Sequence, residues 1–437
     1  MDTKERFDVI VVGGGPAGAA AAYRLAQEKV KVLLVERGHH SGSKNIMGGR
    51  IYTHSLEMLI PDFRERAPLE RKVTKERISI GTSDEMTTME YARQGMKPSE
   101  ESYVVLRSKF DQWLVKEAES QGALVISNMV VDELLLDTKD RDGNNQPRVI
   151  GIRCGADTVY ADLVIIAEGT NTLLLEQAKL GASPNPHHMA VGVKETFTLS
   201  KDIIEDRLGL LPDQGMAWLM VGDMTDGLLG GGFVYTNKTS VSVGVVVGLD
   251  SIGMVNSTVE DMLVKFEDNP IIRPLLKGGK LVEHSAHMVP EGGYQSMPRL
   301  GGLGYIVVGD AARMCMNLGY TIRGMDLAIG SGHCGAEAYL VSARQGKLDD
   351  IGVVYKKFID ASWIGKDLKL YQNVPHFLGS TPRIFKEYPT FVNDIMSDVF
   401  TVNSDGATSI MKKLWRRMNE VGMVQLGKDA LKGVRSL

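Results

Sequence analysis

The sequence predicts an α/β protein: a parallel sheet covered by helices, a second, antiparallel sheet inserted into it, and a helical C-terminal segment. Three observations support this fold. Residues 7–36 follow the order strand, helix, strand, which is typical of a βαβ unit in a parallel sheet. Apolar runs separated by glycine-rich turns occupy residues 189–283, as expected for an antiparallel sheet. A strand followed by a helical pattern then returns at residues 305–308.

The composition is that of a globular chain. Its 437 residues are 43% hydrophobic and 24% charged, which excludes disorder as the main architecture. The net charge of −4 lacks the basic excess of a nucleic-acid-binding protein. The three cysteines, Cys154, Cys315 and Cys334, form no CxxC pair, so we expect a reducing compartment, no disulfide framework and no metal site. We see no secretion signal and no apolar run of ~20 residues, and therefore expect a cytoplasmic protein that at most rests on a membrane surface.

The first strand, residues 7–12, ends in a glycine motif. Gly13–Gly18 contains G-x-G-x-x-G and opens a helix over residues 16–28, and Glu36 closes the next strand, residues 30–35. This context is typical of dinucleotide binding, because the glycines admit a pyrophosphate and the helix N-terminus supplies N–H donors. Glu36 is then placed to accept hydrogen bonds from the ribose. A plain turn between strand and helix is the alternative, which this full context disfavours.

The following elements carry two ambiguous patterns. Residues 106–121 predict a helix, and Arg107 at its start either pairs with a cofactor phosphate or is a surface arginine. Residues 124–126 predict a short strand. The buried strand at residues 163–167 leads into a glycine turn at residues 168–171, which either closes on the cofactor or only joins strand and helix.

The inserted sheet is predicted from strands at residues 191–197, 233–235 and 241–247, with a glycine turn at 230–232. The predicted division of the chain has four segments: residues 1–185 and 286–350 form the two parts of the nucleotide-binding domain, residues 186–285 form the inserted substrate domain, and residues 351–437 form the helical segment.

Gly309 and Asp310 follow the strand at residues 305–308, about 300 residues after the first motif. A second contact from so far along the chain suits a long ligand, so we expect FAD, with Asp310 at its ribityl or pyrophosphate region. A second G-x-G-x-x-G, Gly330–Gly335, follows no strand and lies in a helical pattern. We interpret its glycines as helix-packing positions.

Together these elements resemble the glutathione-reductase-type FAD flavoproteins, whose Rossmann-like group includes aromatic hydroxylases and geranylgeranyl reductases. Residues 44–52, 227–237 and 314–326 are similar to the FixC branch of the electron-transfer-flavoprotein:quinone oxidoreductases, and the likeness extends to the tail through Val434. The resemblance implies an FAD-binding domain that carries an inserted antiparallel quinone domain.

The resemblance also implies which residues contact FAD. The loop at residues 48–50 and the turn at residues 317–324 would flank the isoalloxazine, and the backbone of Val131 would touch the adenine. The full set expected to bind the cofactor is Gly13, Gly15, Pro16, Ala17, Gly18, Glu36, Arg37, Gly48, Gly49, Arg50, Arg107, Val131, Gly169, Gly309, Asp310, Asn317, Arg323 and Gly324.

No catalytic acid or base is predicted, because the flavin carries the chemistry. Arg50, Tyr52 and Arg323 are candidates for steering electrons or quinone, or else they only hold the fold. The resemblance implies electron transfer from a two-subunit electron-transfer flavoprotein to a quinone. It also implies a small ferredoxin-like iron–sulfur subunit, because no cysteine follows Cys334, where larger members of the family carry a four-cysteine cluster.

Two rival functions remain open: an NAD(P)H-dependent flavin hydroxylase or isoprenoid-chain reductase of the same fold, and a flavoprotein scaffold without turnover. Because a long-chain quinone stays in the bilayer, we expect peripheral attachment to the inner face of the cell membrane. The candidate contacts are the apolar stretch at residues 216–229 and the tail at residues 412–437, which has seven basic and two acidic residues. Packing of this tail on partner subunits is the alternative.

Overall fold

The first sheet forms around the predicted βαβ unit. The computed structural model describes residues 6–44, 49–137, 147–181, 183–404 and 406–437. Strand β1 pairs in parallel with β2 and β10, and β10 pairs in parallel with β17, in the order β16-β17-β10-β1-β2-β7. Strands β8 and β9 extend it beside β10. The strands are β1 (Arg6–Val12), β2 (Val32–Val35), β7 (Leu124–Ile126), β8 (Glu133–Asp137), β9 (Arg148–Cys154), β10 (Asp157–Ile166), β16 (Gly301–Gly302) and β17 (Tyr305–Val307).

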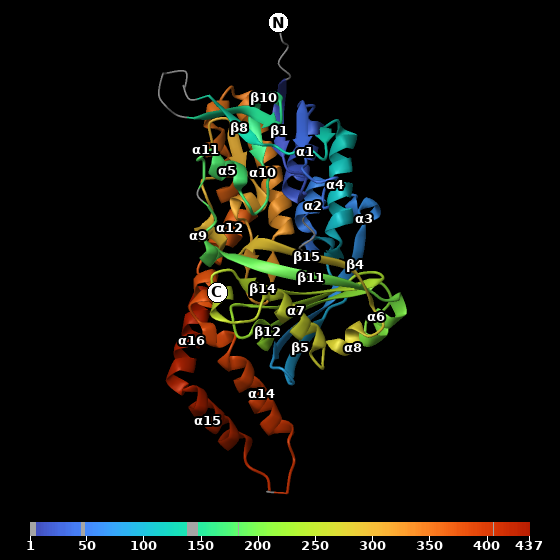
Figure 1. The fold of residues 1–437 in the computed structure, drawn as a ribbon, viewed down its shortest axis with the longest axis vertical. Helices are drawn as coiled ribbons and strands as arrows, with labels where there is room; N and C mark the ends of the chain where they lie inside the picture. Colours follow the sequence, from blue (N-terminus) through green and yellow to red (C-terminus); the bar gives the residue numbers. More distant parts are fainter. Residues whose placement is uncertain (1–5, 45–48, 138–146, 182, 405) are drawn as a thin grey trace.

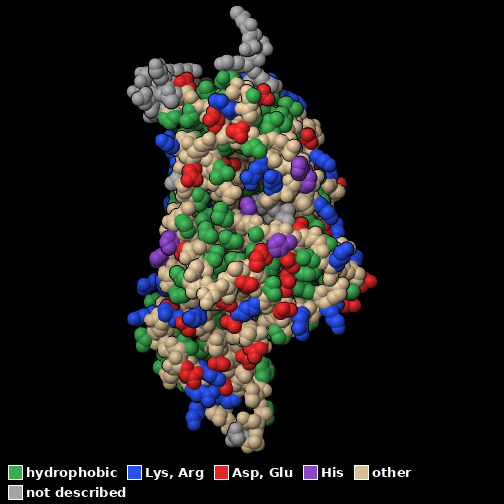
Figure 2. Space-filling model, viewed as in Figure 1, with side chains coloured by type: hydrophobic (Ala, Val, Ile, Leu, Met, Phe, Trp, Pro, Cys, Tyr) green, Lys and Arg blue, Asp and Glu red, His purple; other side chains and the backbone are tan. Residues whose placement is uncertain are grey.

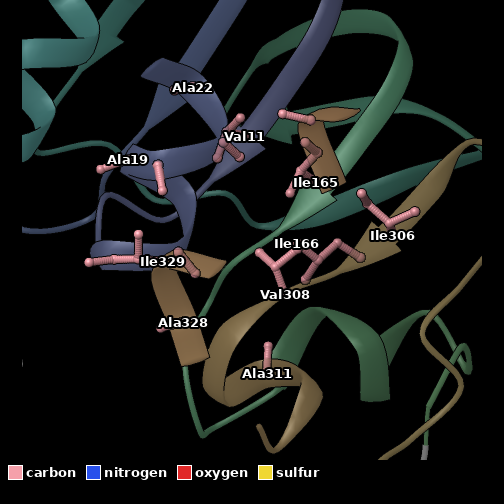
Figure 3. Packing of buried hydrophobic residues seen from close by; sticks show 14 of the residues in the cluster. Val11, Ala19, Ala22, Ile165, Ile166, Ile306, Val308, Ala311, Ala328 and Ile329 are labelled. Atoms are coloured by element: carbon pink, nitrogen blue, oxygen red, sulfur yellow. The ribbon is translucent and has the colours of Figure 1, made fainter. Parts of the chain in front are cut away.

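Small residues allow two helices to pack closely against this sheet and each other. Helix α1 (Pro16–Gln27) buries Ala19–Ala22 and lies against α10 (Met325–Arg344) and α4 (Arg107–Gln121). A Cβ at Gly332 in α10 would come within 2.0 Å of the Ala17 carbonyl oxygen. The glycines at 330–335 are thus packing positions, as predicted. Figure 3 shows the apolar residues at this junction, including Val11, Ile165 and Ile329.

The second sheet lies across the molecule below the first (Figure 1). Its order is β15-β11-β14-β13-β12-β4-β6-β3, with β5 beside β4. Strands β12 and β4 run parallel, so the sheet is mixed and not purely antiparallel as predicted. The two strands come from distant segments, so no hairpin constrains their direction. The strands are β3 (Arg50–Tyr52), β4 (Leu69–Gly81), β5 (Met86–Ala92), β6 (Ser102–Val105), β11 (Met189–Thr198), β12 (Gln214–Gly222), β13 (Gly230–Thr236), β14 (Ser240–Gly248) and β15 (Lys280–Pro290).

Strands β3 to β6 come from residues 50–105, where no strand was predicted. Charged residues recur along β4, and β5 is largely exposed, so neither strand has a clear apolar alternation. The four-segment division of the chain stays a prediction, and the second sheet draws strands from the first of those segments as well as from the inserted one.

A second core lies between this sheet and helix α7 (Val259–Asp268). It contains Met216, Trp218, Met220 and Leu228. The apolar stretch at residues 216–229 therefore packs inside the protein, and its assignment as a membrane contact is wrong. The apolar, Met-rich composition that suggested a membrane contact reflects β12, whose side chains are mostly buried.

The C-terminal segment is helical, as predicted. Helices α14 and α15 form a hairpin that protrudes from the body, and α16 returns to it (Figure 1). No helix among the described residues is long and apolar enough to cross a membrane. The remaining helices are α2 (His54–Leu59), α3 (Phe63–Arg66), α5 (Leu173–Gln177), α6 (Lys201–Leu208), α8 (Arg273–Leu276), α9 (Gly293–Ser296), α11 (Ile351–Ala361), α12 (Trp363–Leu370), α13 (Val374–Gly379), α14 (Glu387–Phe400), α15 (Ile410–Val421) and α16 (Met423–Ser436).

Candidate functional site

A long groove runs over the carboxyl ends of the parallel strands and ends against the second sheet. It consists of two cavities of about 340 and 190 Å³. The carboxyl ends of parallel strands are where ligands bind in open α/β sheets. We call the two together the cofactor groove. The residues that line both cavities are Gly15, Arg107, Ala167, Gly169 and His287.

The glycines of the first motif differ in what surrounds them. A Cβ at Gly18 would lie 2.0 Å from the Gly13 carbonyl oxygen, and Gly13 itself has a φ of +106°. Both positions therefore require glycine for the fold. A Cβ at Gly15 would have no protein atom within 4 Å, because Gly15 faces the open groove at the N-terminus of α1. This open cradle, with unpaired helix N–H groups beyond it, fits a pyrophosphate.

Glu36 lies at the far end of the groove from the second sheet. Its two carboxylate oxygens accept hydrogen bonds from the backbone N–H groups of Gly14 (2.8 Å) and Gly38 (2.6 Å). These contacts hold the carboxylate at the end of β2, where it lines the first cavity beside Arg37 and Val131. A carboxylate has about four acceptor sites, so oxygens held this way can still accept ribose hydroxyls.

Arg107 and Asp310 meet at the middle of the groove. The Arg107 guanidinium donates to both oxygens of Asp111, at 2.8 and 2.7 Å, and is itself buried. Burial raises the pKa of the Asp310 carboxyl, and the positive charge of Arg107 opposes this rise. Arg107 is therefore not a surface arginine, and its charge lies where a cofactor phosphate would pass.

The second sheet forms the apolar end of the groove. Gly49, Arg50, Phe233 and Tyr235 line the smaller cavity there. Arg50 is fixed by an ion pair with Glu76, and burial raises the pKa of the Tyr235 hydroxyl far above its usual value. A planar ring entering this end would contact aromatic and aliphatic side chains.

Most of the predicted cofactor residues come together at this groove. Those that line it are Gly13, Gly15, Pro16, Ala17, Glu36, Arg37, Gly49, Arg50, Arg107, Val131, Gly169, Asp310 and Gly324. Gly18 and Gly309 support it from behind: a Cβ at Gly309 would meet Ala17 at 2.8 Å. Gly48 lies outside the described residues.

Arg323 and Asn317 are placed elsewhere. The Arg323 guanidinium pairs with Asp326 and Asp367 and lies 5.2 Å from the centre of the Trp363 ring, so it does not line the groove. Asn317 lines a neighbouring cavity. The resemblance implied both positions, through the turn at residues 317–324. The turn lies between β18 (Met316–Asn317) and β19 (Ile322–Arg323), and of its residues Ile322 and Gly324 line the groove instead.

Several groove residues were not predicted, among them His287, Glu291 and Cys315. Strand β15 continues seven residues beyond the predicted end of the sheet, from Glu283 to Pro290, and brings His287 over the groove. Burial, together with the charges of Arg107 and Arg37, lowers the pKa of His287. Residues 284–289 have no regular alternation of apolar and polar side chains, so no local pattern indicates that the strand extends this far.

Comparison with known proteins identifies the family. Family models match a FAD binding domain at residues 6–205, an ETF-QO ubiquinone-binding domain at residues 189–289, and the ETF-QO/FixC family C-terminal domain at residues 374–437. The chain is 43% identical to Protein FixC of Escherichia coli O157:H7 over 440 residues, covering 100% of each chain. The chain belongs to the ETF-QO/FixC family. It is also 41% identical to the probable electron transfer flavoprotein-quinone oxidoreductase YdiS of Escherichia coli K12, covering 99% of each chain.

As an ETF-QO/FixC family member, the protein is an FAD-dependent oxidoreductase, and the cofactor groove has the features that FAD requires. Solved structures share this fold. A geranylgeranyl bacteriochlorophyll reductase-like protein from Thermoplasma acidophilum superimposes with a TM-score of 0.68 at 20% identity, covering 97% of this chain and 99% of that one. The flavin-dependent brominase Bmp2 gives 0.63 at 15% identity, with coverage of 97% and 100%.

A further cavity of about 510 Å³ adjoins the apolar end of the groove; we call it the outer cavity. Glu291 lines both. The outer cavity lies between the start of β11, the end of β14 and helix α13, so the family's ubiquinone-binding and C-terminal segments both contribute to it. Its apolar lining residues are Met189, Leu228, Leu229, Met254, Leu378 and Phe385.

Proposed function

We propose that this protein accepts electrons from a two-subunit electron-transfer flavoprotein and passes them through FAD to a membrane quinone. One observation carries the proposal: the segment that matches a ubiquinone-binding domain, residues 189–289, also lines the apolar end of the cofactor groove through Phe233, Tyr235 and His287. A quinone bound to that segment would lie next to the flavin. The relative YdiS of Escherichia coli K12 is named a probable electron transfer flavoprotein-quinone oxidoreductase, which supports the same donor and acceptor.

In this proposal the groove residues have separate roles. Glu36 and Val131 hold the adenosine end, Gly15 and the α1 N-terminus hold the pyrophosphate, and Asp310 contacts the ribityl region. Gly49 and Gly324 flank the ring. Bound FAD supplies the redox chemistry, and the protein supplies position and a surface that excludes water.

A small ferredoxin-like subunit is the proposed further partner. All three cysteines are free and buried, and Cys154, Cys315 and Cys334 lie on separate elements. Since a cluster needs four thiolates, we expect the isolated chain to purify yellow and without stoichiometric iron. Iron with cluster absorbance in the isolated chain would contradict this expectation.

Membrane attachment is proposed through the tip of the α14–α15 hairpin. Val402 is 95% exposed and Phe400 78% exposed, and Ile410 and Trp415 are also exposed. The basic residues of the tail are less available than their number suggested, because Arg416 and Arg417 pair with Asp398. Figure 2 shows basic and acidic side chains next to each other on the protruding end of the molecule. Apolar burial in the lipid surface, more than charge, would then hold the protein.

An anaerobic titration tests the proposed function. The isolated FAD-loaded chain is mixed with reduced electron-transfer flavoprotein, and the flavin spectrum should bleach. A water-soluble quinone analogue is then added, and the oxidised spectrum should return. If reduced electron-transfer flavoprotein leaves the spectrum unchanged, the donor is wrong; if no quinone reoxidises the flavin, the acceptor is wrong.

The rival function is an NAD(P)H-dependent hydroxylase or isoprenoid-chain reductase. A geranylgeranyl bacteriochlorophyll reductase-like protein shares this fold. The rival function requires a nicotinamide donor. We expect NADH or NADPH alone to reduce the flavin slowly in a stopped-flow experiment. The glycine motif that follows a strand, residues 13–18, faces the cofactor groove, so bound FAD would occupy it and a nicotinamide dinucleotide could not. Rapid reduction without partner proteins would favour the rival.

A further inference from the structure

Glu291 lies in the wall between the cofactor groove and the outer cavity. It follows directly after β15, and its backbone N–H donates to the His188 carbonyl oxygen at 2.8 Å. Its side chain lines both the apolar end of the groove and the outer cavity. No other residue among those described is shared by these two cavities. A carboxyl group here can reach a molecule on either side of the wall.

Asn317 holds this carboxyl in place. The Asn317 side-chain oxygen accepts the backbone N–H of Gly319 at 2.8 Å, which leaves its amide nitrogen as the donor towards Glu291. That nitrogen donates to Glu291 Oε1 at 3.2 Å. The carboxyl therefore has a fixed orientation, and no lysine or arginine among the described residues forms an ion pair with it.

We propose that Glu291 is the proton donor for quinone reduction, acting on a quinone head group held in the outer cavity beside the flavin end of the cofactor groove. This inference rests on the proposed function, because it needs a quinone as electron acceptor. The outer cavity supplies the space: at about 510 Å³ it can take a head group that the 190 Å³ cavity cannot hold together with a flavin ring.

The proton balance of the reaction calls for such a group. A quinone that becomes a quinol gains two electrons and two protons. Bound FAD, once reduced and singly deprotonated, would supply two electrons and one proton. Glu291 gives the second proton to a quinone oxygen from its carboxylic acid and regains one from water that enters through the outer cavity. No other oxidant or reductant is needed.

The surroundings of Glu291 keep its proton available near neutral pH. Burial raises the pKa of the Glu291 carboxyl to about 7, and the Asn317 hydrogen bond opposes this rise. The Cys315 thiol interacts electrostatically with the Glu291 carboxylate, and the other titratable residues that line the outer cavity are His187, His188, Asp250 and His376. Burial raises the pKa of the Cys315 thiol and lowers that of the His188 imidazole, so both are neutral at pH 7. A general acid works best when its pKa is near the working pH.

The first experiment follows reoxidation of the reduced, FAD-loaded protein by a water-soluble quinone analogue across pH. In the wild-type protein the rate constant of reoxidation should be constant below about pH 7 and fall above it, because the protonated Glu291 carboxyl is the donor. Glu291→Gln should lower this rate constant about 100-fold and remove the pH step. Reduction by electron-transfer flavoprotein, which precedes the quinone step, should be unchanged.

Asn317→Asp provides a second variant of nearly the same shape. It keeps an acceptor for Gly319 but places a second carboxylate next to Glu291, which raises the Glu291 pKa. The pH step should then move to higher pH. Glu267→Gln is the matched control: that carboxyl also has a pKa raised to about 8, by burial and Glu195, but it lines none of these cavities. Its removal should leave the step in place.

Infrared titration of the protein without FAD gives a readout that does not depend on activity. In a Glu267→Gln background, one component of the carbonyl band of protonated carboxylic acids should titrate with a midpoint near pH 7, and that component should be missing from the difference spectra when Glu291→Gln is added, whatever other buried carboxyls such as Asp310 contribute to the band. If the wild-type protein reduces quinone and Glu291→Gln does so with the same rate and the same pH step, this inference is wrong and the proposed function stands. A wild-type protein that reduces no quinone would overturn the proposed function.

Discussion

At the residue scale, two glycines of one motif are needed for different reasons. Gly18 is needed by the protein, because a Cβ there would meet the Gly13 carbonyl oxygen at 2.0 Å. Gly15 has an ordinary extended backbone, with φ −72° and ψ −179°, and open space around its missing Cβ. No packing contact within the protein requires glycine at that position. A substitution at Gly15 should therefore separate cofactor binding from folding.

We expect Gly15→Val to leave the free energy of unfolding of the cofactor-free protein within about 0.5 kcal/mol of wild type. The same change should weaken FAD binding at least about tenfold, or about 1.4 kcal/mol, because the side chain occupies the pyrophosphate position. Fluorescence titration with FAD and urea unfolding measure the two effects. Gly18→Ala is the control, and it should destabilise the protein itself. Full FAD affinity in Gly15→Val would exclude this pyrophosphate site.

At the element scale, the C-terminal helices are joined by one carboxylate. Asp429 in α16 accepts hydrogen bonds from Tyr388 in α14 at 2.6 Å and from Arg383 at 2.8 Å, and is buried. The hydrogen bond from Arg383 lowers the pKa of Asp429 to about 2. The ordinary value is 3.8, so ionised Asp429 stabilises the docked helix by about 2 kcal/mol at neutral pH.

We expect this stabilisation to be present above about pH 4 and lost as the pH falls towards 2, because the depressed pKa belongs to the folded state. Asp429→Asn should make α16 open more easily at pH 7 and should abolish most of the difference between pH 7 and pH 3. Hydrogen exchange of the α16 amides measures it. Glu420→Gln removes a half-exposed carboxylate of α15 and should have little effect. Equal exchange in wild type and Asp429→Asn at pH 7 would contradict the assignment.

At the scale of the whole molecule, the protruding hairpin decides how the protein meets a membrane. Burying one large apolar side chain contributes about 2 kcal/mol, so several at the tip suffice for reversible binding. We expect the protein to float with anionic vesicles even at moderate salt, and replacement of Phe400, Val402 and Trp415 by serine to release it.

Neutralising Arg416 and Arg417 tests the charge contribution separately. Because both pair with Asp398, their replacement by glutamine should change flotation by less than the serine variant does. If only the arginine variant is released from the vesicles, the basic tail is the main membrane contact. If wild-type protein never floats at any salt concentration, the hairpin binds a partner protein and the quinone is reached through it.

The positions of Gly13, Gly15 and Glu36 at the groove, where we propose that pyrophosphate and adenosine bind, could be predicted from the sequence, because they depend on local patterns. A strand, a glycine motif and a helix follow one another within residues 6–27, and their geometry leaves the chain few alternatives. Asp310 was predictable for the same reason, since its strand and turn are contiguous. Residues 330–335 could be interpreted as packing glycines from the sequence as well, because no strand precedes this second G-x-G-x-x-G.

Only the tertiary structure decided which residues come together at the apolar end of the cofactor groove. Glu291 and Asn317 are 26 residues apart and meet through a side-chain hydrogen bond that neither local pattern indicates. Strands β3 to β6 join a sheet whose other strands begin more than 80 residues later. Arg323 was expected beside the flavin, but Asp326 and Asp367 bind its guanidinium. Secondary structure and glycine turns follow from neighbouring residues, whereas cavities and ion pairs depend on which distant surfaces pack together, and that is settled only when the whole chain folds.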